Sequence, residues 1–182
     1  MATKKELREE MRRRRAAVPA EERRAVSLAI CRALAGRDEV RRAFAARKPV
    51  AVYIATGDEI DLGPFIRDAL AAGAPLAAPR WNGVEYEAAE LASLDGLVPG
   101  PMGVLEPPRS APKAVPAVWI TPGLAFSADG RRIGYGGGWY DRMLAAAGGG
   151  AAALGVAYRF QVLDCVPSGP DDVPLDGVIS AD

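Results

Sequence analysis

Continuous apolar runs are the feature that most constrains the fold of this chain. The segments Val50–Ala55 (VAVYIA) and Ala117–Thr121 (AVWIT) lack the polar and apolar alternation of a half-exposed strand. Runs of this kind are typical of strands that are buried on both faces, as in parallel sheets. Four further segments predict strands: Leu76–Ala78, Tyr86–Leu91, Ala153–Ala157 and Val178–Ser180.

Helical patterns separate these strands. Thr3 and Glu6 form a capping-box pair at the start of a helix that runs to about Ala17, and Asp61 is placed to cap another helix. The expected helices cover residues 3–17, 20–35, 61–73 and 139–147, whereas residues 95–116, rich in Pro and Gly, are expected to form an extended connection. The alternation predicts an α/β fold: a three-layer sandwich with a mainly parallel central sheet flanked by helices, in one domain spanning residues 1–182.

The composition excludes several classes of chemistry. The chain has 23 basic and 23 acidic residues and no histidine, which excludes Ser-His-Asp and Cys-His catalysis and His-ligated zinc. Carboxylates, Arg, Lys, Tyr, backbone amides and a hard cation such as Mg²⁺ remain, and this set favours phosphoryl transfer. Cys31 and Cys165 lack metal-like spacing, and no run reaches the ~20 apolar residues that span a bilayer. We therefore expect a cytoplasmic protein that binds neither membranes nor nucleic acid.

The segment Arg131–Asp141 (RRIGYGGGWYD) is the strongest candidate for a ligand-binding loop. Its four glycines lack a Cβ that would keep a ligand from the backbone, and they allow positive φ, so that successive amides can form an anion-binding nest. Two arginines precede these glycines, and two aromatic rings and a carboxylate follow them. This combination suits a polyphosphate beside a flat heterocycle.

The loop does not match the better-known phosphate motifs. A Walker A loop ends in Gly-Lys-Ser/Thr, whereas Trp139 follows Gly138 here, and a dinucleotide fingerprint starting at Gly134 would also need glycine at position 139. The alternative is a flexible surface turn. Two adjacent large aromatic residues after three glycines argue against that alternative.

The N-terminal helix has a basic face with two interpretations. Lys4 and Arg8 are four residues apart and share a face, which Arg12 and Arg15 continue. Acidic residues interleave with them, so the residues alone favour a solvated charged helix over a phosphate-binding one. A nucleic-acid interface is weaker still, because the helix has no aromatic residue on which a base could stack.

Carboxylates form a third candidate group. They lie directly after the first apolar run and near the C-terminus: Asp58, Glu59, Asp61, Asp171, Asp172 and Asp176. Such residues can hold Mg²⁺ or hydrogen-bond a polar heterocycle, but they are also common helix caps and turn formers. Asp141, in the loop helix, could likewise complement the helix dipole only.

Taken in series, these segments resemble the 5-formyltetrahydrofolate cyclo-ligase family, also called methenyltetrahydrofolate synthetases, over essentially the whole chain. The glycine loop is highly specific for the family. The other segments are weak signals individually, but their occurrence in the same order along the chain strengthens the resemblance. The segments that carry the resemblance are Lys4–Arg8, Asp58–Asp61, Pro79–Arg80, Gly103–Pro107, Pro122–Phe126, Arg132–Arg142 and Asp172–Asp176.

The resemblance implies an ATP- and Mg²⁺-dependent ligase that forms a cyclic C–N bond. ATP would activate the formyl oxygen of 5-formyltetrahydrofolate, with or without a polyglutamate tail, through a phosphorylated formyl intermediate. N10 would then attack, giving 5,10-methenyltetrahydrofolate, ADP and phosphate. We expect a monomer. Two alternatives remain: a relative with the same nucleotide site and another substrate, and a non-catalytic nucleic-acid-binding module.

The resemblance also implies roles for individual residues. The catalytic residues would be Arg132, Tyr135 and Gly137. Mg²⁺ would bind Asp141 and Asp172. ATP would bind Lys4, Lys5, Glu6, Leu7, Arg8, Arg132, Ile133, Gly134, Tyr135, Gly136, Gly137, Gly138, Trp139 and Tyr140. The folate would bind Thr56, Asp61, Tyr135, Gly136, Gly137, Gly138 and Trp139, with Asp61 at the position of a pterin-binding carboxylate.

Overall fold

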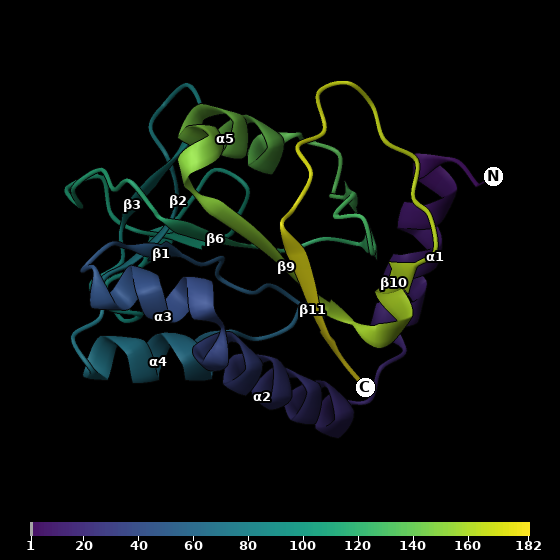
Figure 1. Ribbon diagram of the computed structural model, residues 1–182, viewed down its shortest axis with the longest axis horizontal. Helices are drawn as coiled ribbons and strands as arrows, with labels where there is room; N and C mark the ends of the chain where they lie inside the picture. Colours follow the sequence, from purple (N-terminus) through teal and green to yellow (C-terminus); the bar gives the residue numbers. More distant parts are fainter. Residues whose placement is uncertain (1) are drawn as a thin grey trace.

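A six-stranded sheet crosses the centre of the computed structural model, which describes residues 2–182 (Figure 1). Its strands lie in the order β11-β9-β6-β1-β2-β3, and all neighbours are parallel except the antiparallel pair β2 and β3. The strands are β1 (Val50–Ala51), β2 (Leu76–Trp81), β3 (Tyr86–Glu90), β6 (Val118–Thr121), β9 (Ala152–Tyr158) and β11 (Gly177–Ala181). The predicted mainly parallel sheet is confirmed.

Helices cover both faces of this sheet. In Figure 1, α2, α3 and α4 lie together on one face, and α5 lies on the other. Their bounds are α2 (Ala20–Gly36), α3 (Asp38–Ala45), α4 (Gly63–Ala71) and α5 (Trp139–Ala147), followed by a short 3-10 turn, η1 (Gly148–Gly150). The three-layer α/β arrangement expected from the sequence is therefore confirmed. Within residues 2–182, no helix is both long and apolar enough to cross a bilayer.

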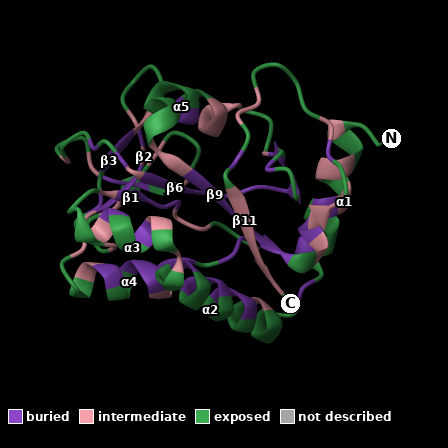
Figure 2. Ribbon diagram, viewed as in Figure 1, coloured by how far each residue is buried: buried purple, intermediate pink, exposed green. Residues whose placement is uncertain are grey.

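The inner faces of the helices pack on the sheet to form the main core (Figure 2). Ile30 and Leu34 of α2, at helical spacing, are almost fully buried together with Ile120 of β6. Burial of each such side chain stabilises the fold by about 1.5–3 kcal/mol. The apolar periodicity of α2 thus fixes which face of that helix meets the sheet.

Helix α1 (Lys4–Ala16) lies at one side of the molecule, against a small second sheet. Thr3 caps it, and the predicted capping box with Glu6 is present. Leu7 and the buried Met11 pack on Ile133 of the small sheet. That sheet has the order β10-β7-β8 and consists of β7 (Ala125–Ser127), β8 (Arg132–Ile133) and β10 (Val162–Leu163), the last preceded by the 3-10 turn η2 (Arg159–Gln161). This packing holds the basic face of α1 beside the glycine loop.

Two expectations for the segment after the first strand are wrong. The strand predicted over Val50–Ala55 is only β1, although Val52 still donates to the carbonyl of Ala77 at 2.8 Å. Val52 and Tyr53 are buried, so their apolar character reflects core packing rather than a longer ladder. Asp61 is not the cap of α4: Leu62 holds that position, and the Asp61 carboxylate accepts from the amide of Gly63 at 2.7 Å.

Other elements had no clear signal in the sequence. Helix α3 has only eight residues and buries just Val40 and Ala43, so its apolar pattern is too short to detect. The expected extended connection over residues 95–116 contains an antiparallel hairpin of β4 (Val98–Pro99) and β5 (Leu105–Glu106). Each of these strands has only two residues, and the segment is rich in Pro and Gly, so its sequence shows no strand pattern.

Candidate active site

A cavity of about 590 Å³ opens at the carboxyl ends of β1 and β6. Tyr53 and Glu59 reach it from the segment after β1, and Pro122 from the end of β6. The glycine loop, the first turn of α5 and the N-terminal half of α1 form other walls. Ligands of parallel sheets bind beyond the carboxyl ends of strands, so this cavity is the candidate active site.

The glycine loop joins β8 to α5 and lines the cavity from Gly134 to Gly138. Gly136 (φ +111°) and Gly138 (φ +65°) lie in the left-handed region, which residues with a Cβ rarely adopt. Gly138 is also the N-cap of α5, where the free amides and the helix dipole favour a negative charge. The predicted role of positive φ thus holds for two of the four loop glycines and does not hold for Gly134 and Gly137.

Three cations face this loop or flank it. Arg8 donates from Nε to the carbonyl of Gly134 at 2.9 Å, and Lys4 reaches the cavity one turn earlier on α1. Arg132 is 7 % exposed, and its Nε has no hydrogen-bond partner among the described residues. A buried donor without a partner is costly, so this region is suited to an additional acceptor such as a phosphate oxygen. The first turns of α1 therefore line the cavity and are not merely a solvated surface.

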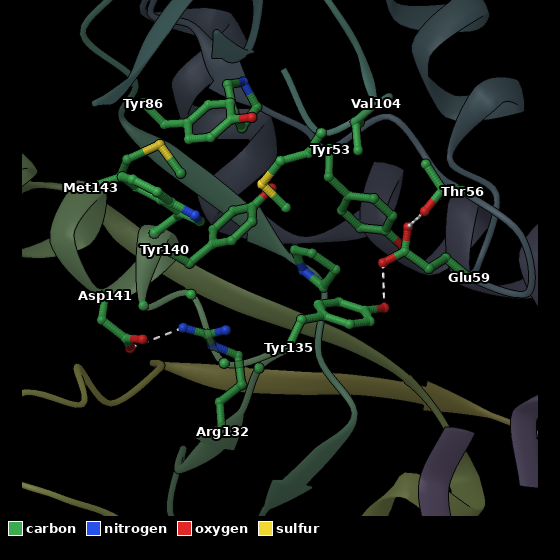
Figure 3. A pocket seen from close by; sticks show the side chains of 18 of the residues that line it. Tyr53, Thr56, Glu59, Tyr86, Val104, Arg132, Tyr135, Tyr140, Asp141 and Met143 are labelled. Atoms are coloured by element: carbon green, nitrogen blue, oxygen red, sulfur yellow. Dashed lines mark hydrogen bonds and ion pairs between the residues drawn. The ribbon is translucent and has the colours of Figure 1, made fainter. Parts of the chain in front are cut away.

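Carboxylates hold two of these cations. Arg132 donates from Nη2 to Asp141 Oδ1 at 2.9 Å (Figure 3), and Lys4 Nζ lies 2.5 Å from Asp172 Oδ2. Burial alone would raise the pKa of Asp172, but hydrogen bonds from Lys4 and the Gly169 amide outweigh it and lower that pKa. We call these two ion pairs, with Arg8, the ion-pair side of the cavity.

Asp141 and Asp172 could hold a divalent cation. Both line the cavity, whereas residues 2–182 contain no cluster of three or more His, Cys, Asp or Glu side chains that could form a complete protein-only site. Mg²⁺ typically binds one or two carboxylates and completes its shell with waters and phosphate oxygens. Two carboxylates beside three cations therefore fit Mg²⁺ that arrives with a polyphosphate.

A second group, the Glu59 side of the cavity, is built around one carboxylate (Figure 3). Glu59 is 9 % exposed and accepts from the Thr56 amide at 2.8 Å, from the Thr56 hydroxyl at 3.1 Å and from the Tyr135 hydroxyl. The hydroxyl of Tyr53, also in this group, donates to the carbonyl of Ile60 at 2.7 Å. Burial, followed by the charge of Glu59, raises the pKa of Tyr135 well above its usual range, so this phenol stays protonated.

Aromatic rings form a further wall of the site. Tyr86 and Trp139 line the cavity and meet each other and Trp81, which does not line it, edge to face, with ring centroids 5.2–5.3 Å apart. The guanidinium of Arg142 lies 4.0 Å from the ring centre of Trp139. Burial raises the pKa of Tyr140, which also lines the cavity. Rings of this kind offer faces and edges against which a flat heterocycle can pack.

The structure brings most of the sequence-predicted site residues together, but not all of them. Of the expected ATP-binding residues on α1, Lys5, Glu6 and Leu7 do not line the cavity. Lys5 is exposed, Glu6 forms the capping box, and Leu7 packs in the core. The residues that do line it are Lys4, Arg8, Thr56, Arg132, Ile133, Gly134, Tyr135, Gly136, Gly137, Gly138, Trp139, Tyr140, Asp141 and Asp172.

Asp61, expected to bind the folate ring, does not line the cavity, and Glu59 does. The sequence contained a signal for this: Thr56-Gly57-Asp58-Glu59 has the spacing of a capping box. Here that spacing forms a turn, in which the Glu59 amide donates back to the Thr56 carbonyl at 3.1 Å. Other lining residues that sequence reasoning missed are Tyr53, Ile54, Pro79, Tyr86, Met102, Val104, Leu105, Glu106, Pro122 and Met143.

Comparisons with known proteins point to one family. The profile of the 5-formyltetrahydrofolate cyclo-ligase family matches residues 1–181. The 5-formyltetrahydrofolate cyclo-ligase of Escherichia coli K12 is 30 % identical over 141 residues, which cover 72 % of this chain and 76 % of the relative.

Two solved structures share the fold. The 5,10-methenyltetrahydrofolate synthetase of Aquifex aeolicus superposes with a TM-score of 0.84 at 31 % identity, over 97 % of this chain and 89 % of that one. The 5,10-methenyltetrahydrofolate synthetase of Mycoplasma pneumoniae has a TM-score of 0.73 at 22 % identity, over 98 % of both chains. At that identity the second likeness concerns the fold alone.

Proposed function

Because this chain belongs to the 5-formyltetrahydrofolate cyclo-ligase family, we propose that it converts 5-formyltetrahydrofolate to 5,10-methenyltetrahydrofolate with ATP and Mg²⁺. The observation that carries this proposal is the joint cavity, in which ion pairs beside a glycine loop share one space with a buried carboxylate and aromatic rings. The first group has the chemistry to bind a triphosphate, and the second to bind a reduced pterin.

The reaction proceeds in two steps. The formyl oxygen attacks the γ-phosphorus, the bond to the β-phosphate oxygen breaks, and ADP leaves. N10 of the folate then attacks the formyl carbon and loses its proton, and the C–O bond to phosphate breaks. The methenyl bridge and free phosphate are the products, and no protein nucleophile takes part. Positioning and electrostatics are therefore the protein's contribution.

The ion-pair side stabilises the moving phosphoryl group. Lys4, Arg8 and Arg132 donate to phosphate oxygens, and the loop amides from Gly134 to Gly138 add dipoles aimed at the same charge. Asp141 and Asp172 would hold Mg²⁺, which would offset the negative charge of the bound triphosphate. Support comes from the ion pairs that already bring these residues together.

The Glu59 side binds the folate ring. Reduced pterins present N–H donors along one edge, and the carboxylate of Glu59 is a buried acceptor in the cavity wall. Tyr135 and Trp139 flank the loop glycines that face the phosphate site, so they contact both substrates. We further propose that residues 1–182 act as one domain, because α1, the loop and Asp172 all contribute to a single cavity. Our proposal for this domain also includes that it is monomeric and cytoplasmic.

A product assay tests the proposal. Protein, ATP, Mg²⁺ and 5-formyltetrahydrofolate are mixed, and formation of the methenyl product is followed by its near-ultraviolet absorbance. We expect product only when all four components are present, with one ADP released per product. Absence of product at high protein concentration, with both substrates shown to bind by calorimetry, would point instead to a relative that acts on another substrate.

A further inference from the structure

Arg15 lies behind the cavity, near the end of α1, and the proposed function assigns it no role. It is 5 % exposed and does not line the cavity. Its Nε and Nη2 both donate to Asp58 Oδ1, the former at 3.0 Å, and its Nη1 donates to the Tyr135 hydroxyl oxygen at 2.7 Å. A buried guanidinium requires a charged partner, and Asp58 supplies it. The bond to Tyr135 is an additional one, directed at a residue of the cavity wall.

This bond sets the direction of the Tyr135 hydroxyl. A guanidinium can only donate hydrogen bonds, so the phenol oxygen has to accept from Arg15. The hydroxyl hydrogen is then left for Glu59, to which Tyr135 donates. The hydrogen bonds therefore run one way, from Arg15 through Tyr135 to Glu59, and the amide and hydroxyl of Thr56 hold the other oxygen of that carboxylate.

The position of Tyr135 in the chain makes such an anchor necessary. It stands between Gly134 and Gly136, and a backbone flanked by glycines restricts a ring only weakly. The guanidinium carbon of Arg15 also lies 5.6 Å from the centre of the Tyr135 ring, a cation–π distance. The orientation of the ring thus depends on Arg15 and Glu59 more than on the loop itself.

We propose that Arg15 is a positioning residue for the folate half of the reaction. Acting through the Tyr135 hydroxyl, it fixes the Glu59 carboxylate in the orientation that receives the pterin edge. This inference rests on the proposed function, because it assumes that Glu59 meets the folate. It assigns Arg15 no contact with either substrate.

Arg15→Gln tests this role, with Arg13→Gln as the matched control. Arg13 is on the same helix, its side chain is 75 % exposed, and it pairs only with Glu10 on the surface, where an ion pair contributes little. For Arg15→Gln we expect the dissociation constant for 5-formyltetrahydrofolate, measured by calorimetry without ATP, to rise about tenfold or more, the size typical of a lost charged hydrogen bond. The KM for ATP should change much less. Arg13→Gln should match the wild type in both.

A double-mutant cycle with Tyr135→Phe separates positioning from general destabilisation. If Arg15 acts through the phenol hydroxyl, the double variant should bind folate no more weakly than Tyr135→Phe alone, whereas independent effects would add. Arg15→Lys keeps the charge, but an ammonium group lacks the planar set of donors with which the guanidinium binds Asp58 and Tyr135 at once. We therefore expect this variant to recover only part of the folate affinity that Arg15→Gln loses. If Arg15→Gln does not fold, Arg15→Lys and Tyr135→Phe are compared in its place, and equal folate binding by these two and the wild type overturns the inference.

The outcomes distinguish this inference from the proposed function. Wild-type folate affinity in Arg15→Gln, or additive losses in the cycle, would overturn the positioning role while the wild-type enzyme still forms product. Failure of the wild-type protein to bind folate or to form product would instead remove the proposed function, and the inference with it.

Discussion

The two sides of the cavity are built in different ways. On the ion-pair side, Lys4 and Asp172 have side chains that are 33 % and 25 % exposed, and each charge is held by one partner of opposite sign. On the Glu59 side, one buried carboxylate is held by neutral donors of Thr56 and Tyr135. The Lys4–Asp172 pair, which water can reach, can exchange partners for phosphate and metal, whereas a carboxylate with fixed donors is suited to recognise a rigid polar ring.

The glycine loop joins the two sides, so a change there should have the largest effect. A Cβ at Gly137 would lie 2.7 Å from the Trp139 indole, and that ring is held by Trp81, Tyr86 and Arg142. For Gly137→Val we expect kcat/KM to fall by ~10²-fold or more, since a misplacement of about 1 Å has that cost. Steady-state kinetics measure it, with circular dichroism to verify the fold.

Gly149→Val is the matched control for this substitution. A Cβ at Gly149 meets no atom within 4 Å, and its φ is not positive. The same side chain is therefore added without displacing a neighbour, and activity should stay near that of the wild type. If both variants had the same kinetics, the glycine loop would not be part of the active site, and it could not join the two sides of the cavity.

Glu59→Gln should weaken the folate side selectively. It removes the charge while keeping an acceptor for Tyr135, so we expect the KM for 5-formyltetrahydrofolate to rise roughly thirtyfold, within the range for a hydrogen bond to a charged group. The KM for ATP should change little. Asp61→Asn is the comparison variant, because Asn can still accept the hydrogen bond from the Gly63 amide. If Asp61→Asn raises the KM for 5-formyltetrahydrofolate more than Glu59→Gln does, Asp61 and not Glu59 binds the pterin.

Arg8→Ala should weaken the ion-pair side, and it should affect ATP more than folate. Its guanidinium lines the cavity and donates to the Gly134 carbonyl, so its loss removes a phosphate contact and one support of the loop. We expect the KM for ATP to rise about tenfold, at the low end for a charge-assisted bond, with a smaller change for folate. Arg12→Ala, an exposed arginine one turn further along α1, is the control. A larger effect on folate than on ATP would contradict the division into two sides.

The sequence predicted the ion-pair side better than the Glu59 side, for a physical reason. The glycine loop carries its chemistry in contiguous residues, so the amino-acid pattern alone indicates Gly134–Gly138. Lys4 and Arg8 share a face at helical spacing, which shows where they point, but only the family resemblance assigned that face to ATP. Glu59 and Arg15 are visible in the sequence only as members of an acidic group and a basic face, because their places in the site depend on how a tight turn and a helix end meet across the fold. The resemblance implied Asp61 as the pterin carboxylate, and the irregular backbone of this acidic segment does not reveal in the sequence that Glu59 turns toward the cavity instead.

The fold shows the same limit. Strands and helices with apolar patterns of several residues were predicted, including α5 with the bounds 139–147 that the structure has. The two-residue strands β4 and β5 were not, because two residues are too few to show a pattern and these strands are defined by their pairing with each other rather than by their own composition. Tertiary contacts, not local propensity, determine such elements.

The smallest predicted effect concerns the ion pair between Arg80 and Glu87, next to the aromatic wall, and it is an effect on stability rather than on catalysis. Arg80 of β2 donates to Glu87 Oε1 of β3 at 2.6 Å, next to Trp81 and Tyr86, and Lys113 lies 3.3 Å from the other oxygen. The hydrogen bond from Arg80, aided by Lys113, lowers the pKa of Glu87 against the effect of burial. A carboxylate with a lowered pKa stabilises the folded state above its unfolded pKa of about 4.3, and this contribution is lost as the pH falls through the folded pKa.

Glu87→Gln should therefore lower the free energy of unfolding at pH 7 by about 1–3 kcal/mol, and the difference from the wild type should shrink below pH ~4. Urea unfolding at pH 7, 5 and 3.5 measures it, with Glu90→Gln, an exposed carboxylate at the end of β3, as the control. Because Glu87 does not line the cavity, the KM values for both substrates should stay close to those of the wild type at pH 7. A difference in unfolding free energy that does not change with pH would contradict this role of the Glu87 charge. It would mean that packing of the aromatic rings alone holds β2 and β3 together, and that these rings keep their positions without the Arg80–Glu87 ion pair.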